Sequence, residues 1–200
     1  MPEYEVSPNQ VPQVEEAEQE ATQDDKEYGC IFCITGREFA VAQRLEKAIP
    51  GLKAISPVKL RYRRMERIAH EEKVILFPGY VFFEVQAGSD VEIRTIYNDQ
   101  DVLKVLYVDD EKKDWRLGDP DKSIAEQFFN MNGVIGFSEA YFDEENRIHI
   151  VKGFLKEHEG KISRINKKAK TAEMQISIGN QKMTLWIGYV VVSNVKNVKL

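Results

Sequence analysis

Residues 71–85, EEKVILFPGYVFFEV, place a long apolar run and three aromatic rings around a Pro-Gly step. The run predicts a buried strand, and Pro-Gly predicts a tight turn within it. Because side chains alternate along a strand, Tyr80 and Phe82 are expected on one face and Val81 and Phe83 on the other. Both faces of this strand therefore carry apolar side chains.

The elements on either side of this strand predict an α+β domain with a ferredoxin-like, split βαβ order. Strands are predicted at 28–35, within 52–77 and at 101–108. Helices are predicted after Thr35 and after Ser89, because each is followed three positions later by a glutamate, as in a capping box. In this order, two helices cover one face of an antiparallel sheet. The first helix is expected to bury an apolar stripe of Phe39, Ala42, Leu45 and Ile49.

Beyond residue 119 the sequence predicts a short helix, a linker and then a small β-barrel of short strands. Asp119 can cap a helix whose first position is Pro120, and Gly133 ends it. Residues 133–143 are expected to be a linker. Stretches such as TAEMQISI and KMTLWI then alternate polar and apolar residues, which predicts a closed or nearly closed barrel over residues 144–200.

Charge is distributed unevenly along the chain. The 200 residues carry a formal net charge of −5. Residues 1–27 hold nine acids and one base, Lys26, so they carry −8 and leave +3 on the remainder. We expect a disordered acidic tail at 1–27 and a first domain at 28–132. The basic remainder indicates a polyanionic partner, although a solubilising tail on an indifferent body explains the charge equally well.

Few residues are arranged for chemistry. The histidines form no HExxH pattern, and no phosphate loop or dinucleotide fingerprint occurs. Cys30 and Cys33 have a CxxC spacing, but a zinc site needs about four ligands and no second pair exists. We therefore expect no enzyme, no catalytic residue, no metal site and no cofactor. No apolar run approaches the roughly 20 residues that span a bilayer, so we expect a cytoplasmic protein without a membrane partner.

Two basic clusters are candidate nucleic-acid-binding surfaces, because lysine and arginine pair with phosphates. The first, in a predicted hairpin, consists of Lys59, Arg61, Arg63, Arg64 and Arg67. The second, in the predicted barrel, consists of Lys152, Lys156, Lys167, Lys168 and Lys170. Each cluster has a plainer explanation, a solvated hairpin tip for the first and a polar turn for the second.

The aromatic face of the central strand is a candidate protein-binding surface. The two predicted helices can cover only one face of the sheet. The rings on the other face are therefore expected to form an exposed apolar patch, which usually marks a protein contact. The alternative is that the linker or the barrel covers this face.

These stretches together resemble the NusG family of transcription elongation factors. LFPGYVFFE at 76–84 is similar to that family's third-strand signature, and TGRE at 35–38 lies at the corresponding place upstream. IVKGFLKEHEGKISRIN at 150–166 resembles the KOW motif, whose hallmark glycine corresponds to Gly160. The resemblance covers residues 28–195 and implies a ferredoxin-like N-terminal domain followed by an SH3-like barrel.

The resemblance also implies a function. NusG-type factors bind the clamp helices of RNA polymerase through an apolar patch and hold the clamp closed, which suppresses pausing and termination. The patch corresponds here to Tyr28, Phe77 and Tyr80. Tyr28 stands where the family commonly has tryptophan.

Departures from the family pattern are similar to those of LoaP-type specialised paralogs. Residues 153–155 are Gly-Phe-Leu where the KOW motif usually has Gly-Pro-Phe or Gly-Pro-Leu, and residues 178–180 are Ile-Gly-Asn in place of Phe-Gly-Arg. This implies a monomeric, operon-specific antiterminator that recognises nascent RNA, with DNA as a second candidate. The alternatives are a housekeeping elongation factor, whose barrel contacts Rho or a small-subunit ribosomal protein, and a ribosome-associated RNA-binding KOW protein.

Overall fold

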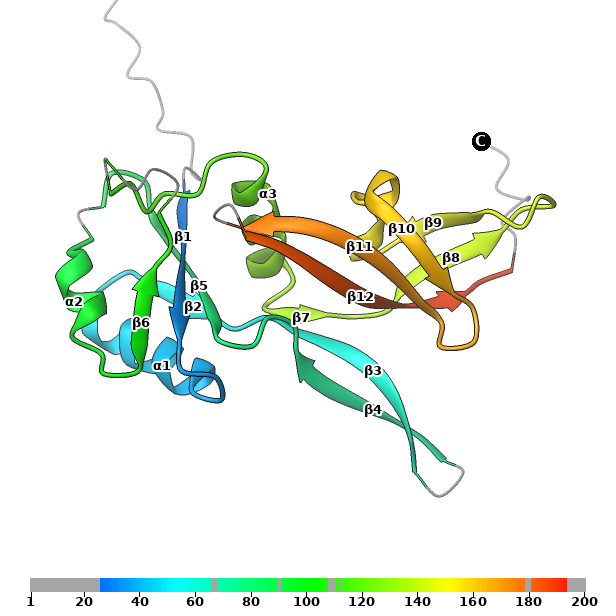
Figure 1. Cartoon of the computed structure of the whole chain (residues 1–200), viewed down its shortest axis with the longest axis horizontal. Coiled ribbons are helices and arrows are strands. Elements are labelled where there is room, and N and C mark those ends of the chain that lie inside the picture. Colours follow the sequence, from blue (N-terminus) through cyan, green and yellow to red (C-terminus); the bar gives the residue numbers. More distant parts are fainter. Residues whose placement is uncertain are drawn as a thin grey trace, which may run out of the picture.

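The computed structural model is mostly β-sheet with few helices (Figure 1). It describes residues 26–193 apart from 66–67, 90, 108–110, 112 and 179–180. The predicted acidic tail lies outside the described residues, except Lys26 and Glu27, which begin the first strand. We call residues 26–133 the N-terminal unit and residues 138–193 the C-terminal unit. In the described part, no helix has both the length and the apolar character needed to cross a membrane.

The N-terminal unit is built on a four-stranded antiparallel sheet in the order β2-β5-β1-β6. Its strands are β1 (Lys26–Cys33), β2 (Lys53–Ile55), β5 (Tyr80–Gln86) and β6 (Val102–Val105). Cys30 lies opposite Phe82 and Gly29 opposite Phe83, so each pair shares a face of the sheet. Gly29 fits because a Cβ there would lie 2.2 Å from the Phe83 ring.

Helices α1 (Glu38–Ala48) and α2 (Ile93–Tyr97) cover the sheet face that carries Val81 and Phe83. Leu45 of α1 and Ile96 of α2 pack into the same apolar cluster as these two residues. The arrangement agrees with the expected cover of one face by two helices. Helix α2 is shorter than the sequence predicts, because it begins at Ile93 instead of directly after Ser89.

The start of α1 differs from the expected capping box. The helix begins at Glu38, and its N-cap residue, Arg37, makes no side-chain cap bond. The buried Glu38 carboxylate accepts hydrogen bonds from the backbone N–H groups of Gly36 (2.8 Å) and Gly79 (2.6 Å), which ties the helix start to the Pro-Gly turn. Because Glu38 faces inward, the next residue faces outward, and Phe39 is 53 % exposed instead of buried.

A long hairpin projects from the N-terminal unit (Figure 1). It consists of β3 (Val58–Met65) and β4 (Ile68–Ile75). The short strand β7 (Val134–Ile135) pairs in parallel with β3 at the base of the hairpin. These three strands form a sheet of their own.

The C-terminal unit is a five-stranded sheet in the order β10-β11-β12-β8-β9. Its strands are β8 (Ser138–Phe142), β9 (Ile148–Lys152), β10 (Ile162–Asn166), β11 (Thr171–Ile178) and β12 (Gln181–Val191). The 3-10 turns η1 (Phe154–Lys156) and η2 (Glu159–Lys161) connect β9 to β10. Among the described residues no pairing joins β9 to β10, so hydrogen bonds do not close the sheet into a barrel.

The segment expected to be a linker takes part in both units. Residues 133–143 contain β7, which pairs with β3, and β8, which pairs in parallel with β12. Sequence reasoning missed these strands because each is short and depends on a partner far away in the chain.

Two apolar clusters hold the molecule together. The first fills the space between the four-stranded sheet and helices α1 and α2. The second begins on the other face of the same sheet, includes α3 (Asp121–Asn130) and continues into the interior of the C-terminal unit. Tyr28 and Phe82 of the sheet, Phe128 of α3 and Phe154 of η1 all belong to it. The two units therefore share one continuous core.

Candidate functional site

The candidate site is the face of the four-stranded sheet that α1 and α2 leave uncovered, which we call the aromatic face. It carries the rings of Tyr28 on β1, of Tyr80 and Phe82 on β5, and of Phe77 in the turn before β5. The centroids of the Phe77 and Phe82 rings lie 5.7 Å apart. The structure therefore places the three residues of the expected patch, Tyr28, Phe77 and Tyr80, on one face.

Helix α3 and the C-terminal unit cover the aromatic face. The centroid of the Phe128 ring lies 5.6 Å from that of Phe77, 5.2 Å from that of Phe82 and 5.9 Å from that of Phe154. Phe128 thus links the rings of the sheet to the interior of the C-terminal unit. Aromatic pairs of this kind contribute about 0.5–1.5 kcal/mol each beyond the area that they bury.

This cover corrects the prediction of an exposed apolar patch. Tyr28 is 4 % exposed and Phe77 is 3 % exposed, and Tyr28 packs against Phe129 with ring centroids 5.7 Å apart. The physical reason is that burying apolar surface is favourable by about 25 cal/mol per Å². The apolar surfaces of α3 and the C-terminal unit belong to the same chain and are close enough to bury these rings. The alternative of a covered face is the arrangement found. A contact of Tyr28, Phe77 and Tyr80 with RNA polymerase stays a prediction.

Tyr80 lies at the edge of the cover. Its ring is half-buried and packs against Phe32, with centroids 5.0 Å apart. Its hydroxyl donates a hydrogen bond to Oε1 of Gln181 at 2.5 Å, at the start of β12. Burial raises the pKa of this hydroxyl, so the hydroxyl stays protonated and remains a donor. The bond connects the aromatic face to the tip of the β11–β12 hairpin.

Hydrogen bonds between polar side chains join α3 to the C-terminal unit, next to the aromatic rings of the aromatic face. Oε1 of Gln127 accepts a hydrogen bond from Nε2 of buried His158 at 2.9 Å, and Nε2 of Gln127 donates to Glu157. Because Nε2 of His158 donates, Nδ1 carries the lone pair, and no described group is placed to hydrogen-bond it. Burial, with a smaller contribution from the nearby Lys161, lowers the pKa of His158 to about 4. The imidazole is therefore neutral near pH 7.

The base of the projecting hairpin also contacts the C-terminal unit. Nζ of Lys59 donates a hydrogen bond to the backbone oxygen of Trp186 at 2.8 Å, and burial lowers the pKa of the amine. The Tyr62 ring stacks on Phe137, with centroids 4.4 Å apart and planes 10° apart. Lys59 therefore lies at a contact between the units, and its contact with phosphate stays a prediction.

The hairpin arginines are described only in part. Arg61 has a described side chain, and its guanidinium pairs with Glu72 at 2.9 Å. The side chains of Arg63 and Arg64, and the whole of Arg67, lie outside the described residues. Their contacts with phosphate stay predictions.

The second basic cluster divides into two groups along β9. Lys167 contacts Asn146 in the turn before β9, whereas Lys152 ends this strand and Lys156 follows it. Nζ of Lys167 also lies 4.4 Å from the centroid of the Phe142 ring. One group is Lys152 and Lys156, and the other is Lys167, Lys168 and Lys170.

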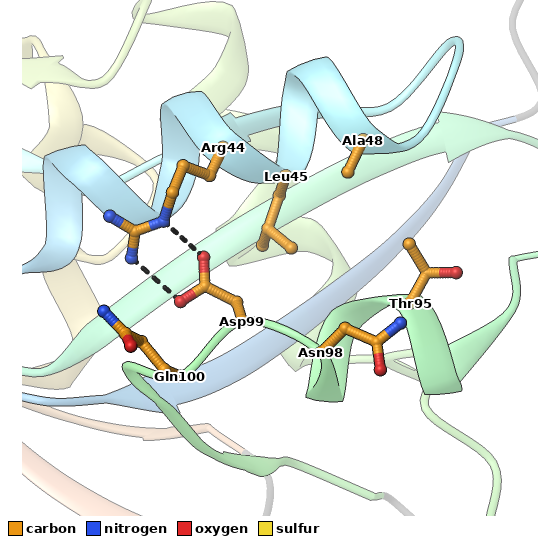
Figure 2. Close-up of a pocket in the computed structure, with 7 residues that line it drawn as sticks. All are labelled: Arg44, Leu45, Ala48, Thr95, Asn98, Asp99 and Gln100. Carbon is orange, nitrogen blue, oxygen red and sulfur yellow. Dashed lines mark hydrogen bonds and ion pairs between the residues drawn. The ribbon is translucent and has the colours of Figure 1, made fainter.

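A cavity of about 440 Å³ lies between α1 and α2 (Figure 2), and an ion pair beside it links the two segments. Nε and Nη2 of Arg44 bind the two carboxylate oxygens of Asp99 at 2.6 and 2.8 Å, and Nη2 also reaches Asp101 at 2.7 Å. The hydrogen bond from Arg44 lowers the pKa of Asp99. The charges that line the cavity are thus paired, and the pair ties α1 to the segment after α2.

Cys30 and Cys33 are free thiols, buried on opposite faces of β1. Burial raises the pKa of both, that of Cys33 to about 11, so neither is a thiolate near neutral pH. In the part of the chain that the structure describes, no group of three or more His, Cys, Asp or Glu residues is placed to hold a metal ion.

The residues that cover the aromatic face escaped sequence reasoning. They are Gln127, Phe128, Phe154, His158 and Gln181. A partial signal exists, because Ile124, Ala125 and Phe128 recur at helical spacing and mark an apolar stripe. The stripe predicts a buried side of the helix but not the surface that it meets.

No protein-family model matches this chain, and no curated protein matches it. Among solved structures, the chain is similar to one described as showing domain interaction in Thermotoga maritima NusG. The TM-score is 0.40 and the sequence identity is 16 %, over 82 % of this chain and 94 % of that chain. A likeness this distant establishes neither a shared fold nor a shared function.

Proposed function

We propose that this chain is a transcription factor of the NusG type, which binds the clamp helices of RNA polymerase through the aromatic face and suppresses pausing and termination. Tyr28, Phe77 and Tyr80 are the proposed contact residues. The stretches 35–38, 76–84 and 150–166 support the family assignment. In the arrangement described here, α3 and the C-terminal unit occupy the face, so polymerase has to displace them.

The observation that carries the proposal is the way in which the aromatic face is covered. In the described residues, no strand pairing joins the four-stranded sheet to the five-stranded sheet. The cover consists of side-chain contacts, chiefly the Phe128 ring and the hydrogen bond from Tyr80 to Gln181. Another apolar surface can replace such a cover without unfolding either sheet.

The energetics of replacement favour a protein partner. Exposing a buried aromatic or large aliphatic side chain costs about 1.5–3 kcal/mol. A partner that uncovers Tyr28, Phe77 and Phe82 must bury a comparable apolar area. The present cover includes the helix α3, so the face already fits a helix. A partner that presents apolar helices meets this requirement, whereas a charged phosphate backbone does not.

We further propose that the protein acts at selected operons and that its basic residues contact nascent RNA. Strands β3 and β4 form a hairpin that projects away from the four-stranded sheet (Figure 1), and Arg61 on β3 is exposed. Replacing Arg61, Arg63 and Arg64 with glutamine is expected to weaken RNA binding and to flatten its salt dependence, because each phosphate contact releases counterions. An unchanged salt slope removes these arginines from the site.

The test uses the full chain, purified RNA polymerase and a template with a terminator. Wild-type protein is expected to bind polymerase and to raise the fraction of run-off transcripts. Phe77→Ala is expected to weaken binding about tenfold or more, because central aromatic anchors dominate interfaces. Phe39→Ala is the matched control, since Phe39 is an exposed phenylalanine on the opposite side of the sheet.

A thermal melt accompanies each variant to separate binding from folding. The proposal fails if wild-type protein neither binds polymerase nor changes run-off. It also fails if folded Phe77→Ala and Phe39→Ala bind polymerase equally well.

A ribosome-associated RNA-binding protein is the second candidate, because residues 161–182 hold six lysines and arginines and one acid. Sedimentation of the protein with ribosomes, in extracts from which polymerase has been removed, favours this candidate over the first.

A further inference from the structure

The charge of the C-terminal unit is divided between its two halves. Residues 138–160 hold six acids and three bases, whereas residues 161–193 hold six bases and one acid, Glu173. We call the six bases of the second half the cationic surface. They are Lys161, Arg164, Lys167, Lys168, Lys170 and Lys182.

Two of these lysines line the same cavity at one end of the cationic surface. Lys161 and Lys182 line one cavity of about 200 Å³, together with Gln175, Ser177 and Pro120 at the start of α3. Within the described part of the chain, neither lysine forms an ion pair. Two like charges that share a small cavity repel each other, and a bound anion relieves the repulsion.

The described chain begins close to this cavity. Arg116 pairs with Glu27 at 2.9 Å, and the backbone N–H of Leu117 donates to the oxygen of Tyr28 at 2.8 Å. Pro120, which lines the cavity, follows Leu117 by three residues, so the first described residue lies within about 20 Å of the cavity. Figure 1 shows the start of β1 on the same side of the molecule as α3, near the end of β11 and the start of β12.

The segment that precedes β1 has the complementary charge. Residues 1–25 contain eight acids and no lysine or arginine. A chain of this length has a root-mean-square span of roughly 25–30 Å. Strand β11, which runs along the cationic surface, has eight residues and is about 26 Å long. The segment is therefore long enough to follow the surface from the cavity to the turn that carries Lys167 and Lys168.

We propose that residues 1–25 bind the cationic surface of the same chain, with Lys161 and Lys182 as the first contact. The tether keeps the segment at an effective concentration near the millimolar range, so it competes with any external polyanion for this surface. Asp119 and Asp121 near the start of α3 oppose the contact. The binding is consequently loose and sensitive to salt, and a polyanion of higher charge density displaces the segment.

The first experiment detects the contact in the full chain with a water-soluble carbodiimide. The reagent activates a carboxylate, a lysine amine attacks it to form an amide, and the carboxylate oxygen leaves in the urea product. We expect cross-links from peptides of residues 1–25 to Lys161 or Lys182 at low salt, far above those to Lys47 and Lys104. The two control lysines are exposed and have no ion pair among the described residues. Equal labelling of all four lysines overturns the proposal.

The second experiment measures competition, with a fluorescent heparin oligosaccharide as the probe. Deleting residues 1–25 is expected to raise the affinity about five- to twentyfold at about 50 mM salt, and less than twofold at about 500 mM salt. Replacing Lys161 and Lys182 with glutamine lowers the affinity itself but removes most of the gain on deletion. Replacing Lys47 and Lys104 with glutamine makes the same change in net charge and leaves the gain intact.

Two outcomes overturn the proposal in this experiment. One is an affinity that does not change on deletion, and the other is a gain that is equal in both pairs of lysine variants. Neither experiment contains polymerase, so a failure of the proposed transcription function leaves both results unaffected.

Discussion

The two faces of the four-stranded sheet are equally buried, but different kinds of element cover them. On one face, Val81 and Phe83 are buried beneath α1 and α2, and Phe83 packs against Trp115 with ring centroids 5.2 Å apart. On the other face, Phe82 is as fully buried, but its cover comes from α3 and the C-terminal unit. Polar groups accompany the second cover, including buried His158.

The difference shows that burial alone does not separate permanent core from a replaceable contact. Helices α1 and α2 lie within the same βαβ order as the strands that they cover, so their removal unfolds the N-terminal unit. The C-terminal unit has its own five-stranded sheet, and among the described residues no strand pairing joins it to the four-stranded sheet. Its Met174 and Leu185 belong to the same apolar cluster as Phe82, but they lie on β11 and β12. We therefore expect this unit to separate from the aromatic face and to stay folded.

The largest expected effect comes from neighbouring residues on opposite faces. Phe83→Ala is expected to lower the free energy of unfolding by about 3–5 kcal/mol and to speed hydrogen exchange across β1, β5 and α1. Phe82→Ala leaves a similar cavity, but its exchange is expected to rise mainly in α3 and η1, because the cover releases first. Identical exchange patterns for the two variants contradict the distinction between the faces.

The sequence predicts those features of the two faces that depend on neighbouring residues, and it does not predict those that depend on contacts between distant residues. Strand β5 and the opposite directions of Phe82 and Phe83 follow from alternation within a few residues. The cover does not, because the stripe containing Phe128 meets Phe154, which lies 26 residues further along the chain. The exposure of Phe39 was missed for a similar reason, since Glu38 takes the inward position to bind the distant N–H of Gly79.

A smaller effect is expected from acid, which should weaken the cover that α3 and the C-terminal unit form over the aromatic face. The pKa of His158 is about 4 in the closed chain and about 6.5 when the ring is free. The contribution of the neutral ring is therefore complete above pH 6.5 and is lost as the pH falls from 6.5 toward 4. At pH 5 the loss is about 2 kcal/mol.

Chemical denaturation at pH 7 and pH 5 measures this loss. His158→Gln serves as the comparison, because the variant keeps a hydrogen-bonding side chain without a titrating group. His149, which lies 2.8 Å from Asp143, is present in both proteins, so the difference between them isolates His158. An equal drop in the two proteins excludes His158 as the cause.

The smallest expected effect concerns the bond at the edge of the cover. Tyr80→Phe keeps the ring but removes the hydroxyl that donates to Gln181. The loss is expected to be about 0.5–1.5 kcal/mol, the usual net value of one hydrogen bond. Gln181→Ala should cost a similar amount, and the double variant should cost no more than either single one. Additive losses show that the two side chains do not act on each other.

The most direct test of the central claim is a distance between the two units. Cysteines introduced at Lys47 and Lys168, both exposed, can carry a donor and an acceptor dye, since the native thiols are buried. Energy transfer is expected to be high in the free protein and to fall when RNA polymerase binds, because the C-terminal unit leaves the aromatic face. Polymerase binding without any change in energy transfer contradicts the account.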